Sequence, residues 1–242
     1  MLAAGADKVL SDLPGGGFDD QHGPGQLPRR ATGDGPARSG RGLWRNGAKR
    51  AFETLLILLT APVTLPLMLL MAGLVALDGH NPFFAQKRIG RNGRVFRIWK
   101  LRSMVVDAES RLQAHLDDHP GDRAQWARTQ KLKHDPRITP VGRLLRKTSL
   151  DELPQLLNVL AGSMALVGPR PMMVGQRHLY RGKSYYRLRP GITGLWQISA
   201  RNESEFAARV RYDAAYERHL SGRLDLWILV RTVGVVLRGT GY

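Results

Sequence analysis

The longest apolar run of the chain is TLLILLTAPVTLPLMLLMAGLVAL, residues 54–77, with no charged side chain between Glu53 and Asp78. Roughly 24 helical residues, at a rise of about 1.5 Å each, are enough to cross the hydrocarbon core of a bilayer. Lys49 and Arg50 directly precede the run. Because basic flanking residues favour the cytoplasmic side, the pattern predicts a membrane helix whose N-terminal end faces the cytoplasm.

Two prolines, Pro62 and Pro66, lie near the middle of this run. Each removes an amide donor and clashes with the carbonyl group four residues earlier, so we expect the helix to break or bend sharply near Pro62. The pattern leaves two topologies open. An ordinary kinked helix would cross the membrane, whereas a helix that turns back at Pro62 would be re-entrant and keep both flanks on one face.

A second apolar stretch, LDLWILVRTVGVVL, covers residues 224–237, and Arg223, Arg231 and Arg238 bound or interrupt it. The stretch is too short and too charged to span a bilayer. It fits an amphipathic helix in the membrane interface with its arginines toward lipid phosphates. It fits a core helix of a globular domain equally well.

The segment between the two apolar stretches mixes short extended pieces with helical spacing. Residues 81–84 and 95–99 are typical of extended chain around a turn at residues 91–93. Helical spacing recurs in four segments, residues 105–119, 141–147, 154–160 and 205–219. The fold class predicted is mainly α with short β pieces.

The first 47 residues are rich in glycine and proline and lack periodic apolar positions. Such a segment cannot bury enough surface to offset its ordering entropy, so we expect a disordered leader. No apolar segment typical of a signal peptide follows the start. The expected organisation is a leader at residues 1–47, a membrane helix at 48–78 and a small globular domain at 79–242.

The formal net charge is +17, of which +16 lies after residue 47, and arginine outnumbers lysine 29 to 8. This charge indicates an anionic partner: nucleic acid, an acidic membrane face or a phosphorylated substrate. Arginine binds phosphate bidentately, which favours phosphate. The absence of cysteine excludes a disulfide scaffold, a cysteine-ligated metal site and thiol catalysis.

The densest polar segment is RKTSLDELPQ, residues 146–155, which contains the adjacent carboxylates Asp151 and Glu152. The spacing of Ser149 and Glu152 is that of a helix capping box, but the helix could instead open at Pro154. Adjacent helical side chains point about 100° apart, so the two carboxylates cannot share one role. One could act as a nucleophile or metal ligand while the other handles a proton.

Basic side chains next to rigid or tight segments are the candidate phosphate ligands. They are Lys100, Arg102, Arg146, Arg170 and Arg189, of which Arg170 and Arg189 adjoin Pro/Gly turns. An arginine fixed by such a turn loses less entropy on binding than one on a mobile helix. The sequence contains no P-loop, no dinucleotide-binding glycine motif and no nucleophile elbow.

Four ordered segments resemble the bacterial sugar transferase family, the monotopic phosphoglycosyl transferases. They are FFAQKRIGRNGRVFRIWKLRSM (83–104), DPRITPVGRLLRKTSLDE (135–152), SLDELPQLLNVLAGSMALVGPRP (149–171) and RPGITGLWQISARN (189–202). The resemblance covers roughly residues 48–242 and is strongest to the small, exopolysaccharide-type members.

The resemblance implies transfer of a sugar 1-phosphate from a UDP-sugar to undecaprenyl phosphate, with release of UMP and a requirement for Mg²⁺. It implies that Asp151 is the nucleophile, forms an aspartyl-phosphosugar intermediate and lies beside the metal, with Glu152 as its partner. Lys100, Arg146 and Arg170 match positions expected to contact phosphates, and Arg189 matches one near the nucleotide. Galactose or glucose is the expected sugar.

The resemblance also favours the re-entrant topology: a monotopic protein of the bacterial inner membrane, with interfacial helices and a cytoplasmic catalytic domain. The helix break of the family falls on Ala61-Pro62, with alanine in place of the usual serine. Glu53 stands where an aspartate is expected and Ser163 where an acidic residue is expected. Anionic inner-leaflet lipids are expected partners, nucleic acid is not, and a homo-oligomer is left open. The alternative is a membrane-tethered basic protein that binds nucleic acid or anionic lipid.

Overall fold

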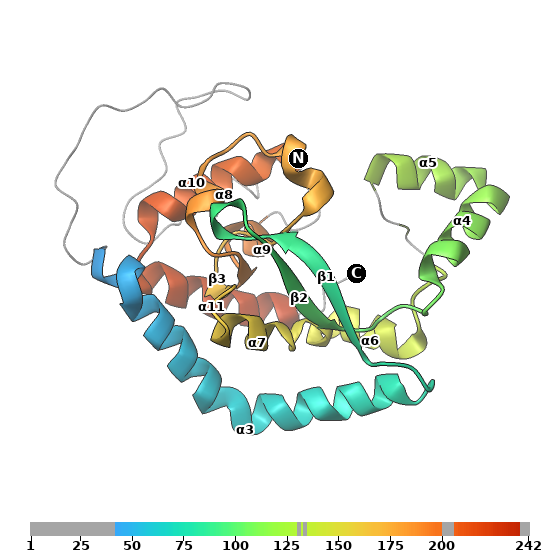
Figure 1. Ribbon diagram of the computed structural model, residues 1–242, viewed down its shortest axis with the longest axis horizontal. Helices are drawn as coiled ribbons and strands as arrows, with labels where there is room; N and C mark the ends of the chain where they lie inside the picture. The colour runs from blue at the N-terminus through green and yellow to red at the C-terminus, as the bar shows by residue number, and fades with distance from the viewer. Residues whose placement is uncertain (1–41, 130–131, 133–134, 200–205, 238–242) are drawn as a thin grey trace. The chain divides into compact units, whose positions relative to one another are not determined.

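The computed structural model describes residues 42–129, 132, 135–199 and 206–237 (Figure 1). Helices predominate, with a few short strands, which confirms the predicted mainly α fold class. The expected leader lies outside the described residues up to residue 41; from Trp44 to Ala48 a π-helical turn, η1, leads into the first long helix.

Two compact units make up the chain. One comprises Met1–Thr60, Gln86–Ile98 and Gln155–Val235, and the other comprises Ala61–Ala85, Trp99–Pro154 and Val236–Tyr242. The first unit contains α7 (Gln155–Leu160), α8 (Ser184–Arg187), α9 (Leu195–Ser199), α10 (Arg209–His219), α11 (Gly222–Leu237), the 3₁₀ segments η2 (Arg91–Gly93), η4 (Val174–Leu179) and η5 (Phe206–Ala208), and strands β3 (Ala165–Val167), β4 (Met172–Met173) and β5 (Gly191–Thr193). The second contains α4 (Ala108–Asp118), α5 (Pro120–Thr129), α6 (Pro140–Thr148) and the 3₁₀ turn η3 (Leu150–Glu152).

Four elements continue from one unit into the other: α3 (Lys49–Ala76), β1 (Phe83–Ile89), β2 (Val95–Leu101) and α11, whose last two residues belong to the second unit. The strands form a sheet in the order β2-β1-β4, with β1 and β4 antiparallel. Asn92 (φ 60°) and Gly93 (φ 74°) make the turn that the sequence predicts between β1 and β2. The first strand extends to Ile89, beyond the predicted residues 81–84.

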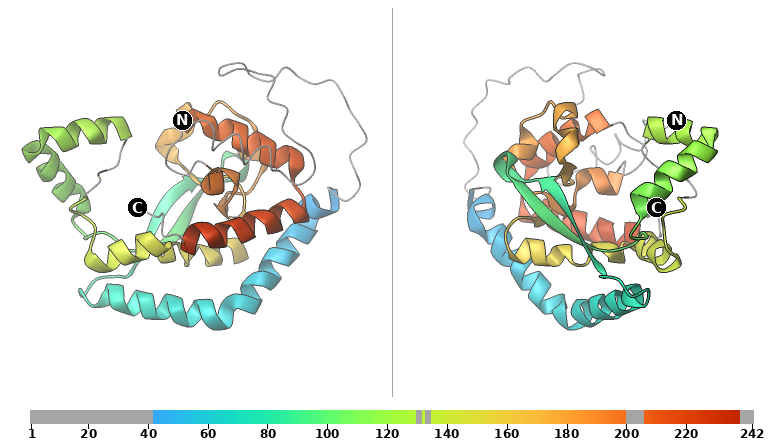
Figure 2. Two further views of the ribbon diagram at one scale, coloured as in Figure 1. Left: turned by 180° about the vertical axis from the view of Figure 1, so that it is seen from behind. Right: turned by 45° about the vertical axis from the view of Figure 1, so that its right-hand side comes forward.

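The core of the first unit forms between α10, α11 and the parallel strands β3 and β5. Figure 2 shows α10 and α11 as neighbouring helices, and Tyr212, Ala215, Leu224 and Ile228 from these two helices are fully buried in that core. The opposite face of α11 leaves the large apolar side chains of Leu226, Val230 and Val233 exposed. The interpretation of this stretch as a core helix is therefore confirmed, and the exposed apolar face leaves its place in a membrane interface a prediction.

Two glycines bring separate sequence motifs into backbone contact in this unit. A Cβ atom at Gly191 would lie 2.1 Å from the amide nitrogen of Gly168, so neither position has room for a side chain. The Gly191 amide donates to the Pro169 carbonyl (2.8 Å) and the Gly168 amide donates to the Thr193 carbonyl (2.8 Å). These bonds fix the backbone on which Arg170 and Arg189 stand.

A buried ionic network ties the start of α3 to the same core. The Lys49 ammonium lies 2.8 Å from Glu53 Oε1 and 2.7 Å from Asp225 Oδ2. Glu53 Oε1 also accepts the backbone amides of Leu166 (2.9 Å) and Val167 (3.3 Å) in β3. Glutamate thus occupies the position where the family pattern has aspartate, and it reaches the strand backbone.

Asp225 receives two further hydrogen bonds. Tyr216 Oη donates to Asp225 Oδ1 (2.6 Å) and Trp44 Nε1 donates to Asp225 Oδ2 (2.9 Å). A carboxylate that is 1% exposed is thereby fully satisfied, as buried charges require. Ser163 stands where the family pattern has an acidic residue. Its Oγ donates to the Asn158 carbonyl (3.1 Å), a local bond that needs no acidic group.

The helix α3 is continuous from Lys49 to Ala76 with Pro62 and Pro66 inside it, so of the break or sharp bend expected near Pro62, the break does not occur. The Thr60 hydroxyl donates to the Leu56 carbonyl (2.8 Å), a bond within the helix that does not replace the amide donor missing at Pro62. The division between the units falls at Thr60–Ala61, directly before Pro62. Within the described part of the chain, α3 is the one helix long and apolar enough to cross a membrane, and 17% of its apolar window is buried.

The second unit holds α6 close to the chain that follows β2. Thr139 Oγ1 accepts the Gly142 amide (2.9 Å) and caps α6, and Pro140 occupies its first turn. A Cβ atom at Gly142 would lie 1.9 Å from the Ser103 carbonyl oxygen. The close approach of α6 to Ser103 therefore requires glycine.

Gly142→Ala is expected to destabilise the protein by about 3 kcal/mol, because the added methyl group must displace the Ser103 backbone. Thermal or denaturant unfolding of the purified chain measures the change. Gly121→Ala in α5 is the matched control, since a Cβ atom there meets nothing within 4 Å. The control should be neutral or slightly stabilising, and equal effects of the two substitutions would contradict the packing argument.

Candidate active site

The carboxylate pair lies on a 3₁₀ turn between two helices. Ser149 ends α6 in the left-handed conformation (φ 58°), and η3 follows with Asp151 and Glu152. The next helix begins at Gln155, directly after Pro154. The Ser149 side chain makes no capping bond to η3. Of the two expected arrangements, the capping box is therefore wrong and the start after Pro154 is confirmed.

Lys100, from β2, joins the two carboxylates. Its ammonium lies 2.7 Å from Glu152 Oε1 and 3.3 Å from Asp151 Oδ2. Asp151 is only 8% exposed. The sequence separates Lys100 from the pair by about 50 residues, and the fold brings together three charges that were predicted to belong to one site.

Arg146 completes the electrostatic surroundings of Asp151. Its Nε donates to Ser103 Oγ (2.9 Å), which fixes the guanidinium of a half-buried side chain. Burial lowers the pKa of Arg146, while the nearby charge of Asp151 opposes that shift. The contact with Ser103 depends on the close approach that Gly142 permits.

Burial raises the pKa of the Asp151 carboxyl above its ordinary value; the Lys100 ammonium opposes this shift and the Glu152 charge adds to it. A carboxylate that is poorly solvated and only partly compensated is more basic than one in water. Such an oxygen is suited to attack an electrophile.

The same pair fits a magnesium ion. Mg²⁺ is commonly bound through one or two carboxylates together with the phosphates of a substrate, and not by a cage of protein ligands. Asp151 and Glu152 supply two adjacent carboxylates, and no group of three or more His, Cys, Asp or Glu that could hold a metal occurs among the described residues. Asp151 and Glu152 are the residues that could hold such an ion together with a phosphorylated substrate.

Arg102 lies elsewhere. Its guanidinium makes a bidentate contact with Asp78 (Nη1–Oδ2 2.7 Å, Nη2–Oδ1 2.6 Å), and its Nε donates to the Asn81 carbonyl (2.8 Å). Hydrogen bonding to Arg102 lowers the pKa of Asp78 to about 2. The structure thus places Arg102 at the C-terminal end of α3 and not with the carboxylate pair.

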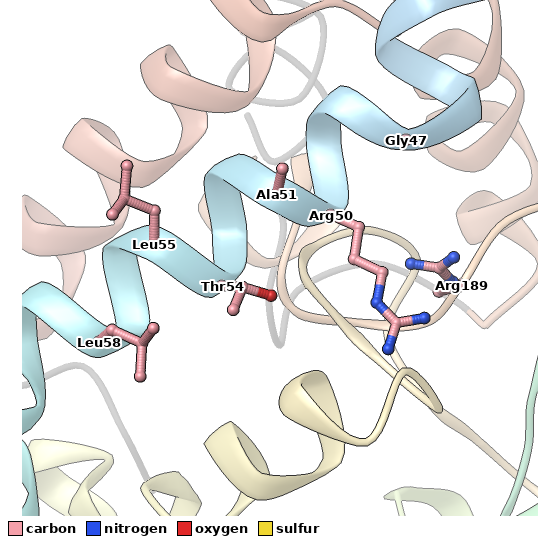
Figure 3. A pocket seen from close by; sticks show the side chains of 7 residues that line it. All are labelled: Gly47, Arg50, Ala51, Thr54, Leu55, Leu58 and Arg189. Carbon is pink, nitrogen blue, oxygen red and sulfur yellow. The ribbon is translucent and has the colours of Figure 1, made fainter.

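Arg170 and Arg189 belong to the other unit, at two different places. The Arg170 guanidinium carbon lies 5.9 Å from the ring centroid of Trp196, and that of Arg209 lies 4.3 Å from the same centroid and 4.6 Å from that of Phe206. Burial, and then the charge of Arg170, lower the pKa of Arg209 to about 10. Arg189 lines a separate open pocket beside the first turns of α3 (Figure 3).

Arg209 was not among the residues predicted from the sequence, because no glycine, proline or acidic pattern marks it. Only its place in the helix predicted at residues 205–219, three residues after Phe206, could have drawn attention to it. Arg209 comes close to Arg170 only because α9 and α10 pack together. This proximity makes Arg209 a further candidate phosphate ligand, beside Arg170.

Comparison with known proteins gives the class to which this geometry belongs. The family model "Bacterial sugar transferase" matches residues 44–239, and the chain belongs to that family. The resemblance found in the sequence is therefore confirmed.

Individual relatives are similar over the same region. The chain is 43% identical over 197 residues to an exopolysaccharide production protein ExoY of Sinorhizobium fredii, covering 80% of this chain and 87% of the relative. It is 44% identical to a UDP-galactose-lipid carrier transferase of Erwinia amylovora and 43% identical to an undecaprenyl-phosphate galactose phosphotransferase of Salmonella typhimurium. Each of these two alignments covers 80% of this chain but 41% of the relative, so the chain spans less than half the length of those proteins.

Lys100→Met is expected to raise the pKa of Asp151 further, because burial and the Glu152 charge then act without the opposing ammonium. The ionised fraction of Asp151 at a given pH should fall. An NMR titration of the labelled aspartate carboxyl carbons measures the shift. Lys147→Met, at an exposed position of α6, is the control and should leave the titration unchanged. A lower or unaltered pKa of Asp151 in Lys100→Met would contradict the conclusion that the Lys100 ammonium opposes the rise in this pKa.

Proposed function

We propose that this protein transfers a sugar 1-phosphate from a UDP-sugar to undecaprenyl phosphate, with release of UMP, as the first membrane step in assembling an exopolysaccharide or related glycan. The observation that carries the proposal is the buried Asp151 carboxylate, held beside Glu152 by Lys100 and near Arg146. Membership of the sugar transferase family and the printed names of its relatives support the same reaction class.

In the first half-reaction an Asp151 oxygen attacks the phosphorus atom that carries the sugar. A bond from Asp151 to phosphorus forms, the bond from that phosphorus to the oxygen bridging to UMP breaks, and UMP leaves with the electron pair. The product is an aspartyl-phosphosugar. The cationic groups of Lys100 and Arg146 offset the charge that develops on the phosphate oxygens, which is the main contribution that a protein makes to phosphoryl transfer.

In the second half-reaction an oxygen of undecaprenyl phosphate attacks the same phosphorus and Asp151 leaves as a carboxylate. When the attacking oxygen of the lipid phosphate carries a proton, Glu152 accepts that proton. The two-step route lets a soluble donor and a lipid acceptor use one site in turn. Mg²⁺, held by Asp151 with the substrate phosphates, would neutralise diphosphate charge.

The site is proposed to lie on the cytoplasmic face of the bacterial inner membrane, with α3 re-entrant. Lys49 and Arg50 at the start of α3 favour a cytoplasmic N-terminal end. The exposed leucines along α3 and the exposed apolar face of α11 are suited to contact with lipid. Relatives named for galactose make UDP-galactose the first donor to test, followed by UDP-glucose.

Asp151→Asn is expected to reduce UMP release by at least roughly 10³-fold, because the amide cannot form the covalent intermediate. Glu152→Gln should reduce it by roughly 10²-fold or more through loss of proton handling. The assay uses the purified chain in lipid with Mg²⁺, undecaprenyl phosphate and a panel of UDP-sugars. Asp118→Asn, at an exposed position of α4, is the control.

Full activity of Asp151→Asn would show that Asp151 is not the nucleophile. Failure to release UMP from every donor, with the protein folded in lipid, would count against the whole proposal. Salt-sensitive binding of nucleic acid under those conditions would then favour the alternative of a basic membrane-tethered binding protein.

The topology is tested by single cysteines placed in a chain that has none. Gly121→Cys and Ala3→Cys are expected to react with a membrane-impermeant reagent from the same side of sealed inner-membrane vesicles. Labelling from opposite sides would show that α3 crosses the bilayer.

A further inference from the structure

An open pocket lies beside the first turns of α3, within the first unit (Figure 3). Its volume is about 630 Å³, and its lining residues are Gly47, Arg50, Ala51, Thr54, Leu55, Leu58 and Arg189. The volume is within the range of small-molecule sites. None of the lining residues except Arg189 belongs to the predicted chemistry.

The polar side of the pocket consists of two arginines. Figure 3 shows the side chains of Arg50, from the helix, and Arg189, from the loop before β5, beside each other. Burial, followed by the charges of Arg50 and Arg91, lowers the pKa of Arg189. Within the described residues, no acidic side chain forms an ion pair with any of these three arginines. The charge of Glu53 acts on Arg189 without forming an ion pair with it and opposes the shift in pKa. Three cations that outnumber the nearby carboxylate favour the binding of an anion.

Both arginines of the pocket stand on fixed backbone. Arg189 precedes Pro190 and Gly191, whose amide is bonded to the Pro169 carbonyl. Arg50 follows Lys49, which is held by Glu53 and Asp225. Paired guanidinium groups on rigid backbone are suited to bidentate recognition of phosphate with little loss of entropy.

The other side of the pocket is apolar. Leu55 and Leu58 are 56% and 58% exposed, although both are large hydrophobic residues. They lie three residues apart on α3 and therefore on neighbouring positions of one helix face. A ligand that satisfies the whole pocket has an anionic head for the arginines and a hydrocarbon chain for the leucines.

We infer that this pocket binds a lipid phosphate, with the phosphate between Arg50 and Arg189 and the hydrocarbon chain along Leu55 and Leu58. A nucleotide would satisfy the arginines but offers no hydrocarbon chain for the leucines, so the pocket matches a lipid better than the nucleotide that was expected near Arg189. Two lipids carry this chemistry, an anionic phospholipid of the bilayer and a polyprenyl phosphate. The inference requires membrane association of α3, and not the proposed reaction at Asp151.

The test measures lipid binding directly. The full chain in neutral detergent is titrated separately with phosphatidylglycerol, undecaprenyl phosphate, UDP and inorganic phosphate, and the bound species are quantified by native mass spectrometry. Arg50→Gln and Arg189→Gln are each expected to weaken lipid binding about 10-fold, as for loss of one charge-assisted hydrogen bond. Arg181→Gln, an exposed arginine of the same unit, is the matched control and should bind as the parent does.

Leu58→Ser tests the apolar side of the pocket. Because Leu58 is exposed, misfolding would not explain a loss of lipid binding in this variant. It should weaken binding of the lipids and leave binding of inorganic phosphate unchanged. Loss of phosphatidylglycerol binding in the arginine variants assigns the pocket to bilayer lipid. Loss confined to undecaprenyl phosphate assigns it to the acceptor, and both results support a lipid-phosphate site.

Unchanged binding of both lipids in Arg50→Gln and Arg189→Gln overturns the inference. So does a loss of UDP binding in these variants while lipid binding is retained, since the pocket would then be a nucleotide site. Neither result bears on UMP release, and a chain that releases no UMP can still be tested for lipid binding.

Discussion

The first unit depends on one buried ammonium group. Lys49 is bound between Glu53 and Asp225, and through them to the backbone of β3 and to α11. Removing one partner of such a network typically costs several kcal/mol, because the remaining charge is left buried and unpaired. This interaction fixes the point at which α3 leaves the core of the first unit. It therefore also fixes the position of Arg50, the next residue, beside that core.

The carboxylate pair shows the opposite electrostatic design. Asp225 is fully satisfied by lysine, tyrosine and tryptophan, whereas Asp151 is buried with incomplete compensation, so its pKa is raised. The first arrangement stabilises the fold, and the second suits the nucleophilic role proposed for Asp151. The two aspartates therefore differ only in what surrounds them.

Much of the fold and part of the candidate site could be predicted from the sequence. Local pattern and family motifs predict α3, α4, α6, α7, α10 and α11, the turn at residues 91–93 and the association of Lys100 and Arg146 with Asp151. They did not predict α5, α8 or α9. The pairing of Arg102 with Asp78 and the place of Arg209 beside Arg170 could not be predicted, because both contacts form only when distant elements pack. Helical continuity through Pro62 was left open, because proline can either break or bend a helix and the sequence does not distinguish the two.

The backbone contact between Gly168 and Gly191 has a consequence for how such proteins can be recombined. Each glycine is needed because the other segment lies against it, so the segments around residues 168–171 and 189–194 form one structural module although the sequence separates them. A chimera between relatives that exchanges only one of the two segments would join backbones shaped for different partners. Exchange of both together preserves the contact and the two arginines that it carries.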